Sequence, residues 1–210
     1  MVSLVANLNQ LSYLPSQIGF SLTNLEQLSV QWNKLRTLPA SVCNLKSLKR
    51  LEVKFNHLKA LPAAIGNLTN LEVLDASCNF MDLQTVPDTI GDLTSLVEID
   101  LSCNQIKCLP PSFGRLQNLK KINILDNPLV IPPMNVAESG CEEIMAFMKE
   151  SWQSFLDEKN RPIEEVDHVP NTWGSWLGKV VSAVTRWPSS IDPNQPSEAS
   201  SIDKLLDQQL

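Results

Sequence analysis

Residues 25–47 read LEQLSVQWNKLRTLPASVCNLKS, and residues 48–70 read LKRLEVKFNHLKALPAAIGNLTN. Aligned on their first leucines, both follow the pattern L-x-x-L-x-L-x-x-N-x-L-x-x-L-P-x-x-(I/V). The same pattern recurs, with one altered final copy, from Met1, Leu71, Leu96 and Leu119. The starts of successive copies are separated by 24, 23, 23, 25 and 23 residues. Chance does not place six such segments in phase, so internal repetition decides the fold.

Each copy opens with a short alternation of apolar and polar residues. In the copy from Leu25, Leu28 and Val30 flank Ser29, as expected of a strand buried on one face. Because the copies stack, their strands are expected to form a parallel sheet whose apolar positions join into one core. The sequence therefore predicts an α/β solenoid, a leucine-rich-repeat horseshoe with its parallel sheet on the concave face.

Every copy also carries an asparagine at one phase: Asn9, Asn33, Asn56, Asn79, Asn104 and Asn127. A buried asparagine must have its amide satisfied. At this phase the amide can bond the backbone where the chain turns out of the strand, which would build a ladder across the repeats. Since every repeat has one, we interpret these asparagines as structural and not as a binding site.

The repeat pattern predicts a division of the chain into five parts. Ser139 with Glu142 fits a capping box, and apolar residues follow it at helical spacing from Ile144 to Leu156. We expect this helix to cover the last repeat. The predicted parts are the repeats (1–133), a C-terminal capping helix (134–157), a linker (158–171), an amphipathic helix (172–187) and a flexible, largely disordered tail (188–210).

Residues 172–187, TWGSWLGKVVSAVTRW, have an apolar stripe at helical spacing together with Lys179, Arg186 and no acidic residue. An interfacial membrane helix has this pattern. A helix that docks on a partner, or back onto the repeats, has it too. A peripheral membrane adaptor is therefore the alternative function to consider.

Composition excludes several classes of function. The net charge of −6 argues against a nucleic-acid surface, which needs clustered cations. The N-terminus has no apolar signal segment, and five cysteines without a CxxC pair favour reduced thiols in the cytoplasm. The two histidines, His57 and His168, have no evident catalytic neighbours, and no phosphate-binding or zinc-binding motif is present. We expect neither an enzyme nor a bound cofactor or metal.

A concave protein-binding face is expected where polar residues alternate with the buried strand positions. One end offers Trp32 and Phe55, which either anchor a partner or simply pack on each other, and the middle offers an acidic strip. Cys78 and Cys103 should lie side by side, as two reduced thiols rather than a metal or redox pair. The predicted partner-binding residues are Gln31, Trp32, Arg50, Glu52, Lys54, Phe55, Asp75, Glu98 and Asp100.

Together the repeats and the segment after them resemble the plant intracellular Ras-group-related leucine-rich-repeat family. That family has a Gly-Val…Tyr…Trp signature on its capping helix, and GCEEIMAFMKESW supplies Gly140, Cys141, Phe147 and Trp152, with Cys for Val and Phe for Tyr. The closing LDQQL also looks like the family's C-terminus. Family members have a longer N-terminal region and more repeats, so the chain resembles their C-terminal half.

The resemblance implies an intracellular scaffold that mediates protein interactions in signal transduction, with a small GTPase or another signalling component as its partner.

Overall fold

The computed structural model describes residues 1–79 and 83–159. The predicted amphipathic helix (172–187), the tail (188–210) and the linker from residue 160 onward lie outside the described residues.

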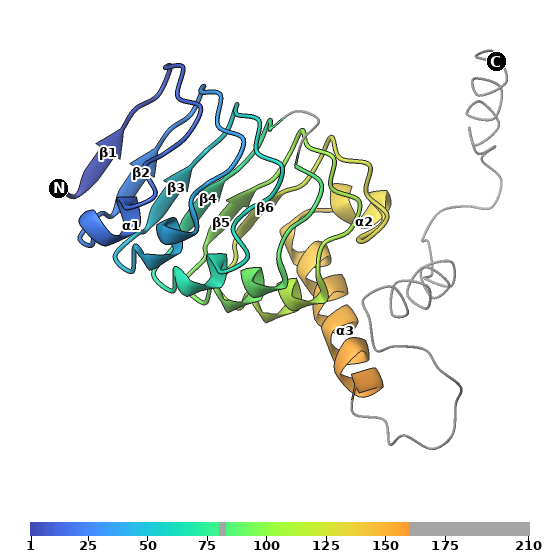
Figure 1. The fold of residues 1–210 in the computed structure, drawn as a ribbon. Coiled ribbons are helices and arrows are strands. Elements are labelled where there is room, and N and C mark those ends of the chain that lie inside the picture. The colour runs from blue at the N-terminus through green and yellow to red at the C-terminus, as the bar shows by residue number, and fades with distance from the viewer. Residues whose placement is uncertain (80–82, 160–210) are drawn as a thin grey trace, which may run out of the picture.

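Six short strands form one parallel sheet in chain order, which confirms the predicted solenoid (Figure 1). Equivalent repeat positions pair in register, so that Leu28 lies beside Leu51 and Leu51 beside Leu74. The backbone ladder continues past the strand ends, for example where Val30 N–H donates to the carbonyl of Glu52 at 2.9 Å. The strands are β1 (Ser3–Val5), β2 (Gln27–Ser29), β3 (Arg50–Glu52), β4 (Val73–Asp75), β5 (Glu98–Asp100) and β6 (Lys121–Asn123).

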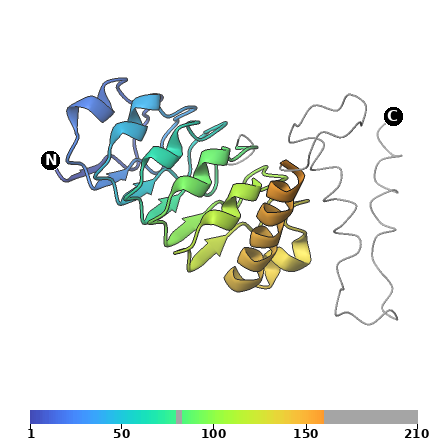
Figure 2. The ribbon, with the colours of Figure 1, turned by 90° about the horizontal axis from the view of Figure 1, so that it is seen from below.

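A row of short helices forms the opposite layer (Figure 2). They are α1 (Ile18–Ser21), η1 (Ala40–Asn44), η2 (Ile65–Asn67), η3 (Asp88–Asp92) and η4 (Pro111–Arg115). The repeat leucines fill the space between the layers and are fully buried in the middle copies. The helices pack closely: a Cβ atom at Gly91 would overlap the backbone carbonyl of Ser112 in the next repeat.

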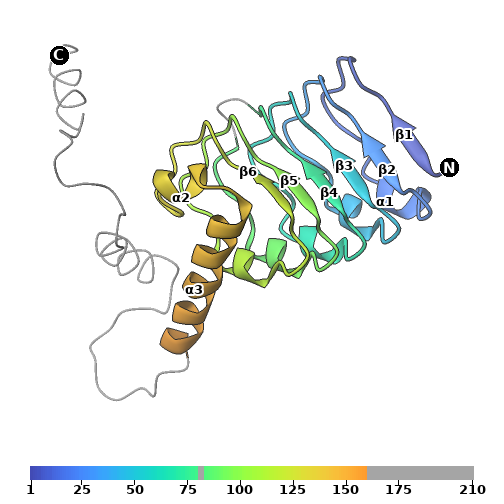
Figure 3. The ribbon, with the colours of Figure 1, turned by 180° about the vertical axis from the view of Figure 1, so that it is seen from behind.

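Two helices, not one, occupy the predicted capping segment: α2 (Met134–Glu138) and α3 (Cys141–Lys159). Gly140 separates them with a φ of 108°, a conformation that glycine adopts without steric cost. The predicted capping box is not formed, because the Ser139 hydroxyl donates to the carbonyl of Asn135 at 2.7 Å and so closes α2. Figure 3 shows α3 against the last repeat, where Ile144 and Met148 are buried.

The asparagine phase forms a ladder of hydrogen bonds between repeats. Asn56 is fully buried, and its Nδ2 donates to the carbonyls of Val30 and Val53, both at 3.0 Å. Its Oδ1 accepts the N–H of Leu35 in the preceding repeat, also at 3.0 Å. Four other asparagines are buried in corresponding bonds: Asn33, Asn79, Asn104 and Asn127.

The sixth asparagine, Asn9, differs from the other five because β1 is at the edge of the sheet. Asn9 is exposed, and its Nδ2 donates to the carbonyls of Ala6 and Asn7 in its own repeat. The expectation of a buried asparagine in every copy therefore does not hold for Asn9. The same edge position leaves Val2, Val5 and Leu8 exposed.

Removal of a buried amide from the ladder should be costly. We predict that Asn79→Ala and Asn104→Ala each lower the free energy of unfolding by roughly 1–3 kcal/mol, because buried backbone groups lose their partners. Asn9→Ala changes the same phase at an exposed position and should cost less than about 0.5 kcal/mol. Urea titrations of the three variants measure the difference. Equal losses in all three would contradict the assigned role of the ladder.

The residue before each asparagine has a left-handed backbone, which the sequence did not reveal. The φ values are 55° at Leu8, 57° at Trp32, 52° at Phe55, 50° at Cys78, 53° at Cys103 and 56° at Asp126. Residues other than glycine and asparagine rarely adopt this conformation. The turn is held because the N–H of the left-handed residue bonds the next repeat, as Trp32 N–H does to the Lys54 carbonyl at 3.1 Å.

The left-handed turn gives a second stability prediction. Cys78→Val should destabilise the fold by about 1–2 kcal/mol more than Cys78→Asn, because a β-branched side chain clashes at positive φ whereas asparagine tolerates it. Both variants lose the thiol, so each controls for the other. Urea unfolding of the two proteins tests the difference, and an equal or greater stability of the valine variant would refute it.

Candidate functional site

Two aromatic rings project from the left-handed turns that follow β2 and β3. Trp32 and Phe55 stack with their ring centroids 3.7 Å apart and their planes at 14°. Although the rings pack on each other, 48% of the Trp32 surface stays exposed. The structure therefore combines the two sequence-based alternatives: the rings support one another, and the outer ring remains available to a partner.

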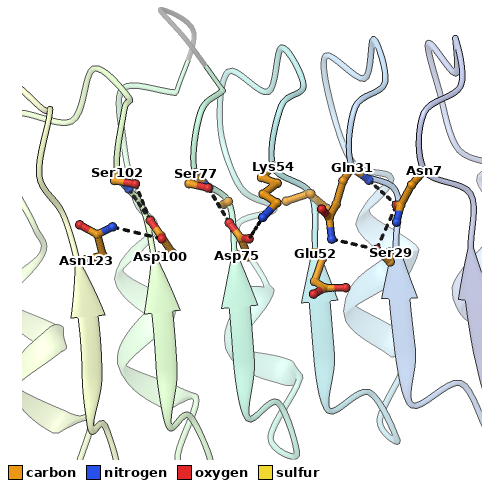
Figure 4. Close-up of polar contacts among 12 residues, drawn as sticks. Asn7, Ser29, Gln31, Glu52, Lys54, Asp75, Ser77, Asp100, Ser102 and Asn123 are labelled. Carbon is orange, nitrogen blue, oxygen red and sulfur yellow. Dashed lines mark hydrogen bonds and ion pairs between the residues drawn. The ribbon is translucent and has the colours of Figure 1, made fainter.

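Most of the predicted charged residues on the sheet face pair with one another. Arg50 contacts Glu52 at 3.5 Å, and Lys121 contacts Glu98 at 3.4 Å. Figure 4 shows the third pair, in which Lys54 contacts Asp75 at 3.3 Å. Pairs at such exposed positions stabilise a fold by at most about 1 kcal/mol. A partner that brings its own charges can therefore exchange them at little cost.

The acidic strip consists of Asp75 and Asp100, whose carboxylates are held by their own chain. Asp75 accepts the hydroxyl of Ser77 at 2.7 Å, and Asp100 accepts the hydroxyl of Ser102 at 2.6 Å and its N–H at 2.9 Å. The repeated Asp-x-Ser spacing is the sequence signal for these turns, and it was not used in the sequence analysis. Asp100 also accepts Asn123 Nδ2 at 3.2 Å. In residues 1–79 and 83–159, Asp100 has no cationic partner.

A further member of this face is Asn7, which the sequence analysis missed. Its Oδ1 accepts the N–H of Gln31 at 2.8 Å and the hydroxyl of Ser29 at 3.0 Å (Figure 4). Gln31 in turn donates to Ser29 Oγ at 3.1 Å. The side chain of Gln31 is therefore oriented by the first repeat. The nine predicted residues lie along the sheet face and its rim from β2 to β5.

Cys78 and Cys103 share the left-handed phase of neighbouring repeats and are free thiols. The Cys103 thiol donates to the Asp126 carboxylate at 3.6 Å. Burial, the neighbouring Cys78 thiol and the Asp126 carboxylate together raise the pKa of Cys103 from 9.0 to about 11. The Cys103 thiol is therefore protonated near neutral pH and is a weak nucleophile.

The raised pKa predicts slow alkylation of Cys103. At pH 8 its thiolate fraction should be about 100-fold below that of a thiol two pKa units lower, because the fraction changes tenfold per unit. Iodoacetamide labelling with peptide mass spectrometry compares the folded chain with the urea-unfolded chain. Asp126→Asn removes one cause of the shift and should accelerate labelling. Equal labelling rates in the folded and unfolded chains would contradict the predicted pKa.

The family-signature residues lie away from the sheet face, at the C-terminal cap. Gly140 precedes α3, and Phe147 is buried beneath that helix. Trp152 is half-buried, and the Arg115 guanidinium lies 5.6 Å from its ring centroid. Cys141 Sγ lies 3.9 Å from the Leu119 carbonyl, and burial raises the pKa of its thiol.

The described part of the chain contains no group of three or more potential metal ligands. Nor is any helix in residues 1–79 and 83–159 both long enough and apolar enough to span a bilayer.

Comparison with known proteins agrees with this geometry. A model described as a leucine-rich repeat region matches residues 4–85, and a leucine-rich repeat model matches residues 95–116. The protein is a leucine-rich-repeat solenoid. This solenoid is 42% identical over 84 residues to plant intracellular Ras-group-related LRR protein 1 of Arabidopsis thaliana. The match covers 40% of the chain and 16% of that relative. The predicted resemblance to this family is thereby confirmed.

Solved structures show the same fold. A leucine-rich-repeat protein of Leptospira interrogans is 38% identical with a TM-score of 0.56, covering 60% of the solenoid chain and 32% of its own. The leucine-rich-repeat domain of the type III effector XopL is 29% identical with a TM-score of 0.56, covering 60% and 45%. The ectodomain of the Arabidopsis receptor kinase SOBIR1 is 24% identical with a TM-score of 0.53, covering 60% and 71%. This third likeness concerns the fold alone.

Proposed function

We propose that this leucine-rich-repeat protein is a non-catalytic scaffold in intracellular signal transduction that binds another protein through its sheet face. The observation that carries the proposal is the exposed ring of Trp32, which is held rigid by its stack on Phe55. Tryptophan is among the residues that contribute most to protein interfaces. A ring already fixed by its neighbour loses little conformational freedom when a partner covers it.

The charges beside Trp32 would give such an interface its selectivity. Lys54 and Asp75 form an exchangeable pair next to the aromatic end, and Asp100 adds a carboxylate without a cationic partner in the described residues. A partner with an apolar side chain opposite Trp32 and a cation opposite Asp100 would match this pattern. The relative's name marks it as intracellular and Ras-group-related. We therefore propose a cytoplasmic partner, with a small GTPase or another signalling component to be tested first.

The size of the sheet limits what it can do alone. Six strands at about 4.8 Å spacing give a floor roughly 29 Å long, narrower than the ~800 Å² per partner of a standard interface requires. The partner in this proposal therefore also contacts the rim, where Trp32 and Phe55 lie.

The test compares two exposed aromatic residues. Trp32→Ala should weaken binding at least about tenfold, because truncation of an interface anchor costs upward of 1.4 kcal/mol. Tyr13→Ala is the matched control, since Tyr13 is 75% exposed but lies on the return segment of the first repeat. Proteins captured from a cell lysate by the wild-type chain are purified, and their affinities for the three proteins are measured by calorimetry.

Two results would count against this assignment. Captured proteins might bind the Trp32→Ala and wild-type chains with equal affinity, which would place the interface elsewhere. Alternatively, both alanine variants could lose binding together, which would show that the aromatic pair has no special role. Thermal unfolding followed by circular dichroism establishes that both variants are folded.

A further inference from the structure

A narrow groove lies where η3, η4 and α3 meet, on the helical side of the molecule and away from the sheet (Figure 2). Its volume is about 220 Å³. The apolar part of its lining comes from Pro111, Trp152 and Phe155, and two carboxylates, Asp88 and Asp92, stand on the η3 side.

The aromatic wall of the groove is fixed in place. The Trp152 and Phe155 rings stack with centroids 5.6 Å apart and planes at 23°. The Arg115 guanidinium lies 5.6 Å from the Trp152 ring centroid and binds Asp92 at 2.7 Å. Both rings nevertheless remain partly exposed. The groove is thus a preformed apolar surface that water covers at a cost.

Size and charge restrict what can fill this groove. Its volume is below the roughly 300–1,000 Å³ of a typical small-molecule site, so it suits individual side chains of a docked segment. Asp88 and Asp92 carry two negative charges against the one positive charge of Arg115. An occupant with large apolar side chains and a flanking cation would therefore complement the groove.

Residues 172–187 of the same chain have this composition. Three tryptophans, Trp173, Trp176 and Trp187, belong to their apolar stripe, and Lys179 and Arg186 are their only charged residues. In a helix these two cations, seven residues apart, would fall on the same side, at one flank of the stripe.

The chain can bring this segment to the groove. The described helix α3 ends at Lys159, four residues beyond Phe155 and therefore about 6 Å further along its axis. Residues 160–171 separate that end from the segment, and twelve residues can span up to about 40 Å. Attachment at this distance gives the segment an effective concentration in the millimolar range.

We propose that residues 172–187 dock in the groove of their own chain as an amphipathic helix. Their apolar stripe contacts Trp152 and Phe155, and Lys179 and Arg186 face Asp88 and Asp92. The docked segment forms a second layer over the C-terminal cap and leaves the sheet face open. This inference is independent of the proposed function, because it concerns the opposite side of the molecule.

Zero-length carbodiimide cross-linking of the full-length chain tests the proposal, because it joins only amines and carboxylates in direct contact. Peptide mass spectrometry should find Lys179 linked to Asp88 or Asp92 in the monomer. Val180→Asp places a charge in the apolar stripe and should reduce that cross-link at least tenfold. Thr185→Asp adds the same charge away from the stripe and should leave the cross-link at the wild-type level.

Hydrogen exchange supplies a readout that does not depend on the reagent. Amides of residues 88–92 and 150–156 should exchange faster in Val180→Asp than in Thr185→Asp, because only the former exposes the groove. Both substitutions lie outside the described fold, and circular dichroism of the solenoid verifies that it is intact.

Three outcomes would overturn the proposal. The first is absence of the cross-link in the wild-type chain. The second is its appearance only in dimers, which would mean that the segment docks on a second copy. The third is co-sedimentation of the wild-type chain, but not Val180→Asp, with phosphatidylserine vesicles while groove exchange is the same in both. That result would identify a membrane surface as the occupant's target.

Discussion

The hydrogen bonds of the buried asparagine amides are the constraint on which the rest of this solenoid depends. Each repeat leaves its strand through a left-handed residue, a conformation that costs a non-glycine residue roughly 1–3 kcal/mol. The amide that follows binds carbonyls of its own repeat and of the preceding repeat, as Asn56 does with Val53 and Val30. Because each of the five buried amides joins two repeats, it fixes the turn and the stacking distance together.

That turn also determines which side chains can meet a partner. Trp32 and Phe55 reach the rim because their backbones are left-handed, and their rings then stack across neighbouring repeats. The strands themselves are three residues long, so each repeat contributes few outward side chains to the floor. Many of these are already bonded within the sheet, as Lys54 is to Asp75. The aromatic rim consequently offers more binding energy per unit of surface than the charged floor.

The two ends of the solenoid differ physically. At the first repeat, Val2, Val5 and Leu8 are exposed along the edge strand β1. At the last repeat, α3 covers η4 so closely that Gly114 has no room for a Cβ atom beside the Met148 carbonyl. The same helix carries Trp152 and Phe155 on its outer side, where they line the groove beside η3 and η4. One helix therefore closes the core inward and offers an apolar surface outward.

The sequence by itself determined the repeat, the parallel sheet, the buried asparagines and the apolar face of α3, because periodic burial is written directly into residue spacing. It also indicated the aromatic and charged residues of the sheet face. Only the tertiary structure decided how those side chains pair. The stacking of Trp32 on Phe55, the Asp75 and Asp100 turns and the orientation of Gln31 by Asn7 depend on distances between repeats. The break at Gly140 and the groove beneath Trp152 likewise depend on how α3 packs on η4, which no single repeat specifies.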